Sequence, residues 1–409
     1  MDSVTRELIC ILINCDIAEM NKILNHFFLG YIILWPLFYN FILPIDGAGR
    51  IYMILSVLIL LLNLLQERFR AVFRNPIVWI WFMWVVYSII NWISCGYPPP
   101  ENLNPISFIC IYLILPWLSM YVAIYESQVR PRLLLKNLHV LFFIYVLLGF
   151  LFQVKTGAVG ERGGNILGNS LPLVSLCLVF ISCLCYSYRL IKVPSFISAI
   201  ILSMLCIFMV ATRKAFAGEL IILFAFFYGN IKKINVQSVL GLLCLGLVLY
   251  FTVPYLLENS ILGERFMNIS DDAEAYNTTN SKFLSLLGDR AYFYITGWEL
   301  FKEFPVCGIG INNYMNVTDY PMPIHSEYIV QLAENGLIGC FLFVLFIVAL
   351  FKKVLSVNVH KSRWIFLGWV FSILFISFTA WIYDCSQYFI IFGVIVGMIN
   401  NRNNLNCLL

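Results

Sequence analysis

Long apolar runs alternate with short polar connections along most of the chain. Apolar runs of roughly 17 to 25 residues have the length of a helix that crosses a bilayer. By this measure about twelve spans are expected, near 27–45, 51–65, 77–95, 106–125, 138–153, 171–188, 195–212, 214–231, 237–254, 336–351, 364–382 and 388–400. The pattern predicts an all-α integral membrane protein with one large outer loop that bears short amphipathic helices.

These spans divide the chain into three expected parts. Residues 1–254 are predicted to form an N-terminal membrane bundle of about nine spans. Residues 255–335 form the large outer loop with the candidate catalytic motifs, and residues 336–409 form a C-terminal group of about three spans.

The composition supports the membrane class and excludes several others. The chain is 61% hydrophobic and 12% charged, whereas a soluble chain carries roughly 25% charged residues. The net charge of +4 comes with no basic stripe, so we expect no nucleic-acid partner. Most of the 13 cysteines lie in apolar runs without metal-ligand spacing, which is typical of small core residues. Cys307 and Cys385 are both expected to face the oxidising side, and we predict that they do not pair.

The basic residues orient the spans. Most of the 26 Lys and Arg residues fall in connections on one side, including those around Arg74, Arg130 and Lys352. The positive-inside rule makes that side cytoplasmic, and both termini lie on it. Arg162, Arg213 and Arg290 fall on the opposite, outer side, against this bias.

Two of these arginines lie in short outer connections. Arg162 stands among five glycines in the segment 155–169, KTGAVGERGGNILGN, where glycine allows close approach of backbone; a merely flexible loop is the equal alternative. Arg213 lies where two spans meet with almost no loop. An arginine there is costly unless it snorkels, faces a wet cavity or has an anionic partner. Glu219 is a candidate resting partner for Arg213.

Arg290 begins a predicted amphipathic helix in the large outer loop. Apolar residues recur at helical spacing between Asp289 and Glu303, and Pro305 is expected to end the helix. A first-turn arginine opposes the helix dipole, which indicates an anion nearby. Gly308 and Gly310 predict a turn directly afterwards.

His325 is the one histidine of the four that is expected at this outer face. Pro321 and Pro323 favour extended chain before it, and a helix is expected directly after it. Glu334 lies about half a turn away around that helix, so it is not expected to be the partner of His325. An unperturbed imidazole pKa of about 6.5 suits proton abstraction from a hydroxyl. The alternative is a histidine that only satisfies its own hydrogen bonds at the interface.

In this order the motifs resemble those of the O-antigen ligase and polymerase superfamily of bacterial polysaccharide assembly. The resemblance rests on A-T-R-K-A around Arg213, G-D-R at Arg290, the P-x-x-G-x-G run from Pro305, and H-S-E-Y-x-x-x-L-x-E-x-G-x-x-G from His325. The R-G-G-N-I-L-G-N segment from Arg162 is similar to the family's Gly- and Asn-rich outer loop.

The resemblance implies an integral membrane glycosyltransferase of the bacterial inner membrane, with its active site on the periplasmic face. Such an enzyme transfers a glycan en bloc from undecaprenyl diphosphate. Arg213 and Arg290 would bind the diphosphate with support from Arg162, since guanidinium groups bind phosphate oxygens bidentately. His325 would orient or deprotonate the acceptor hydroxyl. We expect no metal and no cofactor, because no Asp-x-Asp cluster stands on the outer face.

Two sibling functions and one of another class stay open. A polymerase would use a second lipid-linked repeat unit as acceptor, whereas a ligase would use lipid A-core. The A-T-R-K-A form at Arg213 favours the polymerase, and the NNRNN tail favours the ligase. A chain-length regulator is a further candidate partner. A transporter or flippase of lipid-linked sugars would place charges near the bilayer midplane on broken helices, which this sequence does not do.

Overall fold

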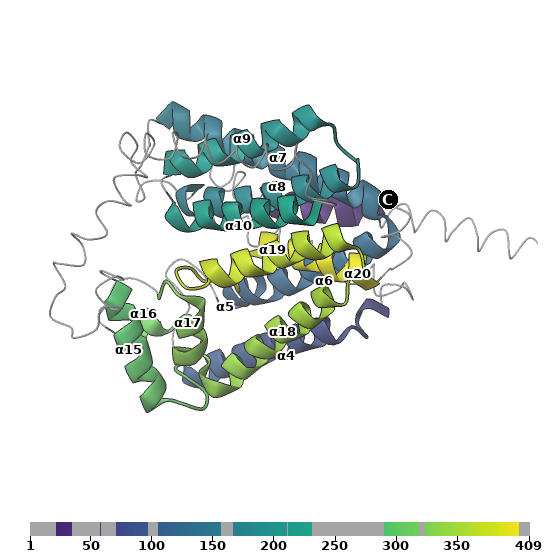
Figure 1. Ribbon diagram of the computed structural model, residues 1–409. Helices are drawn as coiled ribbons and strands as arrows, with labels where there is room; N and C mark the ends of the chain where they lie inside the picture. The colour runs from purple at the N-terminus through teal and green to yellow at the C-terminus, as the bar shows by residue number, and fades with distance from the viewer. Residues whose placement is uncertain are drawn as a thin grey trace, which may run out of the picture.

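The chain folds into a bundle of long helices with a cluster of short helices across one end (Figure 1). The computed structural model describes residues 22–34, 58, 71–96, 105–156, 167–210, 212–230, 290–318 and 324–400. Every regular element in these residues is helical. They are a helix over Lys22–Leu34, α4 (Pro76–Cys95), α5 (Pro105–Phe108), a π-helix η1 (Ile109–Ile114), α6 (Leu115–Val129), α7 (Pro131–Thr156), α8 (Leu167–Ser187), α9 (Val193–Val210), α10 (Arg213–Asn230), α15 (Arg290–Glu303), α16 (Tyr314–Val317), α17 (Glu327–Ala333), α18 (Gly336–Leu355), α19 (His360–Ile376) and α20 (Ser386–Asn400).

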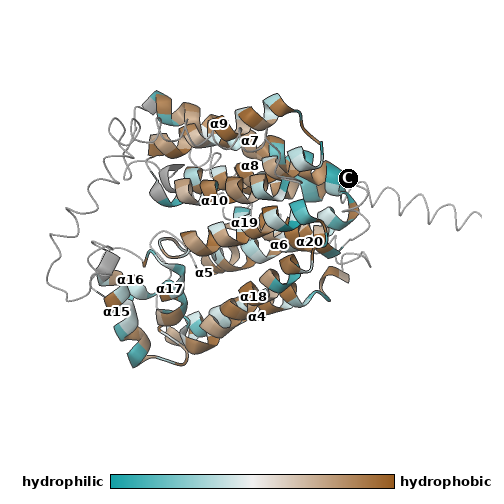
Figure 2. Cartoon of the chain, viewed as in Figure 1, coloured by the Kyte–Doolittle hydropathy of each residue, from teal (hydrophilic) through white to brown (hydrophobic). Residues whose placement is uncertain are grey.

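The long helices lie side by side in pairs that are not always neighbours in sequence. Helix α20 packs on α6, α10 on α19, α18 on α4, and α8 between α7 and α9. The long helices are apolar along their lengths, and hydrophilic residues gather toward the ends of the bundle (Figure 2). Such an all-round apolar surface is typical of helices that meet lipid rather than water.

Aromatic side chains fill the contact between α4, α18 and α20. The rings of Trp81 and Trp84 stack with centroids 4.5 Å apart, and Phe389 lies 4.6 Å from Trp81. Trp81 and Trp84 are almost completely buried. Aromatic pairs at this spacing add to the free energy of burial, and this contact fixes α4 relative to the C-terminal helices.

The helices agree with a membrane-embedded protein. Within the described residues, 5 helices are long and apolar enough to cross a bilayer, namely Pro76–Cys95, Pro105–Val129, Pro131–Lys155, Val193–Val210 and Gly336–Leu355. Three shorter apolar helices accompany them, at Lys22–Leu34, Leu171–Ser187 and Ser386–Asn400. The expected span at 237–254 lies outside the described residues, as does the one at 51–65 apart from residue 58, so the number of spans and the three-part division stay predictions.

One predicted span is too long. The apolar pattern predicted a helix over 364–382, but α19 ends at Ile376, and residues 377–385 form a non-helical turn that we call the α19–α20 connection. Its backbone groups find partners elsewhere in the protein: the N–H of Glu327 donates to the carbonyl of Ser377, with a distance of 2.9 Å. Buried backbone groups outside a helix need such partners.

Candidate functional site

Helices α15, α16 and α17 and the turns between them form a cap on one end of the bundle, over residues 290–318 and 324–335. Helix α15 starts at Arg290 and ends at Glu303, just before Pro305, as the sequence predicted. Phe293 is buried and faces the rest of the cap, whereas Trp298 is exposed. One face of the helix therefore lies on the protein, but the other exposes apolar side chains such as Trp298, so the helix does not separate polar from apolar residues as the sequence predicted. The side chain of Arg290 lies outside the described residues.

The glycine-rich turn after α15 docks on the junction between α17 and α18. The N–H of Ile309 donates to the carbonyl of Ala333 at 3.0 Å, and the N–H of Gly310 donates to the carbonyl of Glu334 at 2.8 Å. The turn thus supplies partners for carbonyls at the C-terminal end of α17, which a helix cannot satisfy itself. This is the structural role of the P-x-x-G-x-G run.

Two glycines make this docking possible. Gly308 has φ +71°, and a Cβ atom there would lie 2.5 Å from the backbone of Glu334. Gly336 has φ +62°, and a Cβ atom there would lie 2.4 Å from the carbonyl oxygen of Val306. Only glycine combines a positive φ with such a close backbone approach. Gly308 of the P-x-x-G-x-G run and Gly336 of the motif that starts at His325 are therefore both needed for the same contact, between the glycine-rich turn and the α17–α18 junction.

The carboxylate of Glu334 holds the other half of the turn. Its Oε2 accepts the backbone N–H of Asn312 at 2.7 Å, and its Oε1 accepts that of Tyr314 at 3.4 Å. Burial raises the pKa of Glu334 to about 8, against the lowering effect of these two donors. The partners of Glu334 thus lie in the turn, in agreement with the prediction that it does not pair with His325.

Glu327 ties the cap to the α19–α20 connection. Its Oε2 accepts the backbone N–H of Ile382 at 2.6 Å, and its Oε1 accepts the side-chain amide of Gln331 at 2.7 Å. Its side chain is completely buried. Burial raises the pKa of Glu327 to about 7, and the bonds from Ile382 and Gln331 lower it again in part. A buried carboxylate of this kind stays favourable only while its partners are in place.

Gln331 and Asn335 extend this polar stripe toward α4, at a spacing of four residues from Glu327. The indole N–H of Trp84 donates to Gln331 at 2.9 Å. The amide of Asn335 donates to Gln331 at 3.3 Å, and Ser88 donates to Asn335 at 3.3 Å. These bonds fix the cap to α4.

His325 lies between α15 and the α19–α20 connection. Its ring centroid lies 5.9 Å from that of Phe293 and 5.4 Å from that of Trp381, with the His325 and Trp381 rings inclined by 30°. The Trp381 indole lies beside Asp384 and partly lowers the pKa of its carboxyl group. Desolvation raises the pKa of Asp384 to about 7, although part of the residue is reachable from the surface. The half-buried imidazole of His325 therefore lies against two aromatic rings, those of Phe293 and Trp381.

The N-terminal end of α10 lies against the same connection. Lys214 donates to the carbonyl of Thr379 at 3.2 Å, and Thr379 is two residues before Trp381. Arg213 is the first residue of α10; its side chain lies outside the described residues. The expected pairing of Arg213 with Glu219 therefore stays a prediction, and the bond that the structure gives Glu219 comes from Ser203, at 3.0 Å.

The structure places His325 near two helices that begin at predicted site residues, whereas the side chains of Arg213 and Arg290 are not described, so the predicted site stays a prediction. The helices that start at Arg290 and Arg213 both reach the surroundings of His325, through Phe293 and through the α19–α20 connection. Arg162 and its glycine-rich segment 157–166 lie outside the described residues. Cys307 and Cys385 are both free thiols. Among the described residues, no three His, Cys, Asp or Glu side chains are grouped to hold a metal ion.

Three residues of this region were missed in the sequence. Trp381 and Asp384 fell in or beside the run that was interpreted as a continuous span, and Glu327 was treated only as part of a motif. The available signal was Asp384 itself, because an acid next to an apolar run rarely faces lipid. The contact of Glu327 with Ile382 joins segments 55 residues apart, and periodicity along one helix does not predict such a contact.

The fold and this region define an integral membrane protein of helices with a polar site at one end of the bundle. A family model described as O-Antigen ligase matches residues 197–344, less than half of the chain. The resemblance to the O-antigen ligase and polymerase superfamily is confirmed over this segment, which includes Arg213, Arg290 and His325. Comparison with curated proteins finds no match.

Proposed function

We propose that this protein is a membrane glycosyltransferase that joins polysaccharide repeat units, taking the growing glycan en bloc from undecaprenyl diphosphate. The observation that carries the proposal is the convergence, within the family segment and the connection next to it, of His325 with the helices that begin at Arg213 and Arg290. A titratable base beside two helix N-termini that begin with arginine suits a reaction that releases a diphosphate.

The leaving group gives the arginines their role. The N-terminal end of a helix carries a partial positive charge and free N–H groups, which favour a bound phosphate. Arg213 and Arg290 stand at two such ends. We assign them to the diphosphate of the donor, with support from Arg162, where they stabilise the negative charge that develops as the glycosidic bond breaks.

His325 is assigned to the acceptor. The acceptor hydroxyl oxygen forms a bond to the anomeric carbon of the donor sugar, the bond from that carbon to the diphosphate oxygen breaks, and the hydroxyl proton passes to the imidazole. Undecaprenyl diphosphate leaves. The face of Trp381, with its inclined ring 5.4 Å from His325, favours the imidazolium that results. The site's own arginines supply the positive charge, so we expect transfer to continue in excess chelator.

The proposed setting is the bacterial inner membrane, with both termini in the cytoplasm and the cap in the periplasm. Arg74 at the start of α4 and Lys352 and Lys353 near the end of α18 lie at the end of the bundle away from the cap. Such cations favour the cytoplasmic side.

Ligation of the finished glycan to lipid A-core is the second candidate function, and the description of the matching family favours it. The test is reconstitution of the purified protein in nanodiscs with a radiolabelled repeat unit on undecaprenyl diphosphate. A ladder of products from this donor alone identifies a polymerase. Transfer only after lipid A-core is added identifies a ligase.

A matched experiment in the native host uses a deletion of the gene and a gel of its lipopolysaccharide. Core with one repeat unit is expected for a polymerase, and bare core for a ligase. An unchanged gel together with no transfer in nanodiscs would contradict both assignments. Movement of label across a proteoliposome membrane without transfer would identify a transporter instead.

A further inference from the structure

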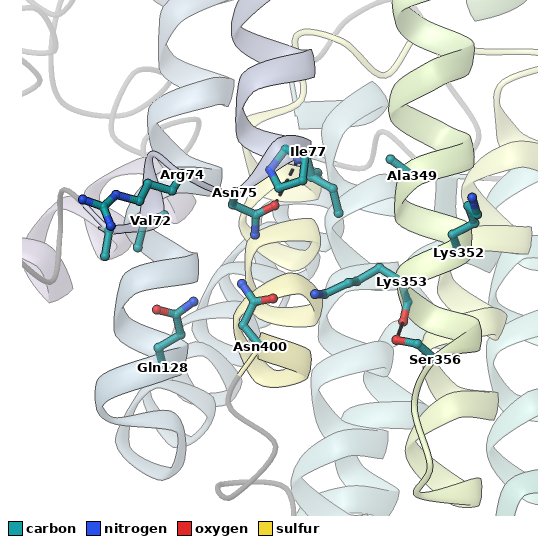
Figure 3. A pocket seen from close by; sticks show the side chains of 12 residues that line it. Val72, Arg74, Asn75, Ile77, Gln128, Ala349, Lys352, Lys353, Ser356 and Asn400 are labelled. Atoms are coloured by element: carbon teal, nitrogen blue, oxygen red, sulfur yellow. Dashed lines mark hydrogen bonds between the residues drawn. The ribbon is translucent and has the colours of Figure 1, made fainter.

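A second polar site lies at the opposite end of the bundle from the cap. Here the ends of α4, α6, α18 and α20 line an open pocket of about 540 Å³ (Figure 3). It is lined by Ala71, Val72, Arg74, Asn75, Pro76, Ile77, Gln128, Ala349, Lys352, Lys353, Ser356 and Asn400. We call it the basic pocket. Its position separates it from His325 by the length of the helices, so its function is independent of the one proposed above.

Among the described residues that line the basic pocket, every charged side chain is positive. Arg74, Lys352 and Lys353 contribute three cations, and the described lining contains no acidic residue. In Figure 3 the Lys353 side chain extends toward Asn400, while Arg74 lies on the other side of α4's first residues. Three cations around one pocket create a positive potential that attracts an anion.

The neutral polar residues of the pocket add hydrogen-bond donors. The side-chain oxygen of Asn75 accepts the N–H of Ile77 at 3.0 Å and caps α4. This bond turns the amide nitrogen of Asn75 toward the side on which Asn400 lies (Figure 3). Gln128 and Asn400 bring two further amides from α6 and α20. Amide donors together with cations are the groups that bind phosphate oxygens.

Exposed apolar side chains continue from the pocket along the two outer helices. Trp79 and Met83 lie on the same face of α4 as Pro76, one and two turns further along, and both are exposed. Leu345 lies one turn before Ala349 on α18, and it is exposed too. An anion with apolar tails would therefore find donors for its head and an apolar surface for its chains.

We propose that the basic pocket binds the phosphate head group of an anionic phospholipid in the leaflet on that side. The cations face the head group, Asn75, Gln128 and Asn400 donate to its oxygens, and the acyl chains lie on the exposed faces of α4 and α18. Pockets of this kind between span ends, rich in Lys and Arg, are suited to such head groups.

The test is native mass spectrometry of the full-length protein in detergent, titrated with three probes. They are dioleoyl phosphatidylglycerol, dioleoyl phosphatidylcholine and glycerol phosphate without acyl chains. We expect the anionic lipid to bind most tightly. The double variant Lys352→Gln with Lys353→Gln should weaken its binding by roughly tenfold or more, whereas Lys352→Arg with Lys353→Arg should retain it.

A matched control removes two cations from the same end of the bundle but outside the pocket. Arg189 and Lys192 are exposed in the turn between α8 and α9, so Arg189→Gln with Lys192→Gln should leave binding unchanged. Equal losses of lipid binding in both glutamine pairs would overturn the proposal, because general surface charge would then explain binding.

Asn400→Asp places an acid in the pocket at an exposed helix end and should weaken lipid binding as well. Unchanged binding in this variant would also contradict the proposal. Equal affinity for glycerol phosphate would assign the pocket to a soluble phosphate compound and reject the lipid.

Discussion

The two ends of the helical bundle handle charge in opposite ways. In the cap, the acids Glu327 and Glu334 are buried and accept backbone N–H groups from distant segments. At the basic pocket, Arg74 and Lys352 are exposed, and the described lining contains no acid. Buried polar groups with fixed partners hold geometry, whereas exposed charges act through the field around them. The cap is thus suited to positioning site residues, and the basic pocket is suited to attracting an anion.

The comparison predicts that substitutions at the two ends differ in kind. In the cap, a lost partner leaves a buried polar group unsatisfied and displaces its neighbours. At the basic pocket, a lost positive charge weakens the binding of an anion and changes the stability of the protein little. The following predictions test this difference, from the largest expected effect to the smallest.

His325→Ala is expected to have the largest effect on transfer. The change removes the base and leaves a space beside Trp381, so the rate of glycan transfer should fall by about 10²- to 10⁴-fold. Binding of the donor should persist, because the arginines are assigned to it. The control is His360→Ala at the first residue of α19, which should retain activity. Full activity in the His325 variant would contradict the assignment of the base.

Glu327→Ala should impair both stability and transfer. It leaves the N–H of Ile382 and the amide of Gln331 without their buried acceptor, which costs about 2 kcal/mol of unfolding free energy. The α19–α20 connection is then free to shift, and a displacement of about 1 Å at a catalytic group costs roughly 10²-fold in rate. Glu327→Gln keeps one acceptor oxygen and should retain more of the stability and more of the transfer rate. Thermal unfolding and transfer kinetics of the two variants measure this order, and a stable, fully active alanine variant would contradict it.

Gly308→Ala tests the docking of the turn on α17. A Cβ atom there meets the backbone of Glu334 at 2.5 Å with φ at +71°, so both strain and overlap act against it. Gly96 is the matched control, because it has φ +69° but nothing within 4 Å of an added Cβ atom. Gly96→Ala should cost about 1 kcal/mol from backbone strain alone. Gly308→Ala should cost clearly more, as measured by unfolding midpoints of the two variants in one detergent.

The contacts of the cap explain which features the sequence could reveal. The limits of α15 and the turns at Gly308 and Gly310 follow from local rules about apolar spacing, proline and glycine, and these predictions are confirmed. The end of α19 does not follow from such rules. An apolar run continues through Trp381, and distant groups such as the Glu327 carboxylate and the Lys214 ammonium provide the partners that let this backbone leave the helix. The local pattern of apolar, proline and glycine residues therefore predicted the motifs of the cap. It did not predict the α19–α20 connection, against which they pack.

The acids of the cap should make its stability depend on pH. Burial raises the pKa of Glu334 from an ordinary value of 4.5 to about 8 and that of Glu327 to about 7. A raised folded-state pKa gives stability that is fully present below the unfolded value and is lost as pH rises through the folded value. Unfolding midpoints should therefore fall between about pH 5 and pH 8. Glu334→Gln should flatten this dependence, and an equally steep dependence in that variant would contradict the assignment.

Trp381→Phe should have the smallest effect on transfer. Phenylalanine keeps an aromatic ring beside His325 but removes the indole N–H that lowers the pKa of Asp384. One hydrogen bond to a charged group contributes about 1.5 to 3 kcal/mol at most, and only part of this reaches His325, so the rate should fall by a few-fold. Because the acid then loses its donor, the pKa of Asp384 should rise further, and the pH–rate profile should shift with little change in KM. If the rate of transfer falls as far as in His325→Ala, Trp381 contacts the substrate itself. The region around His325 would then bind substrate as well as position its catalytic residues.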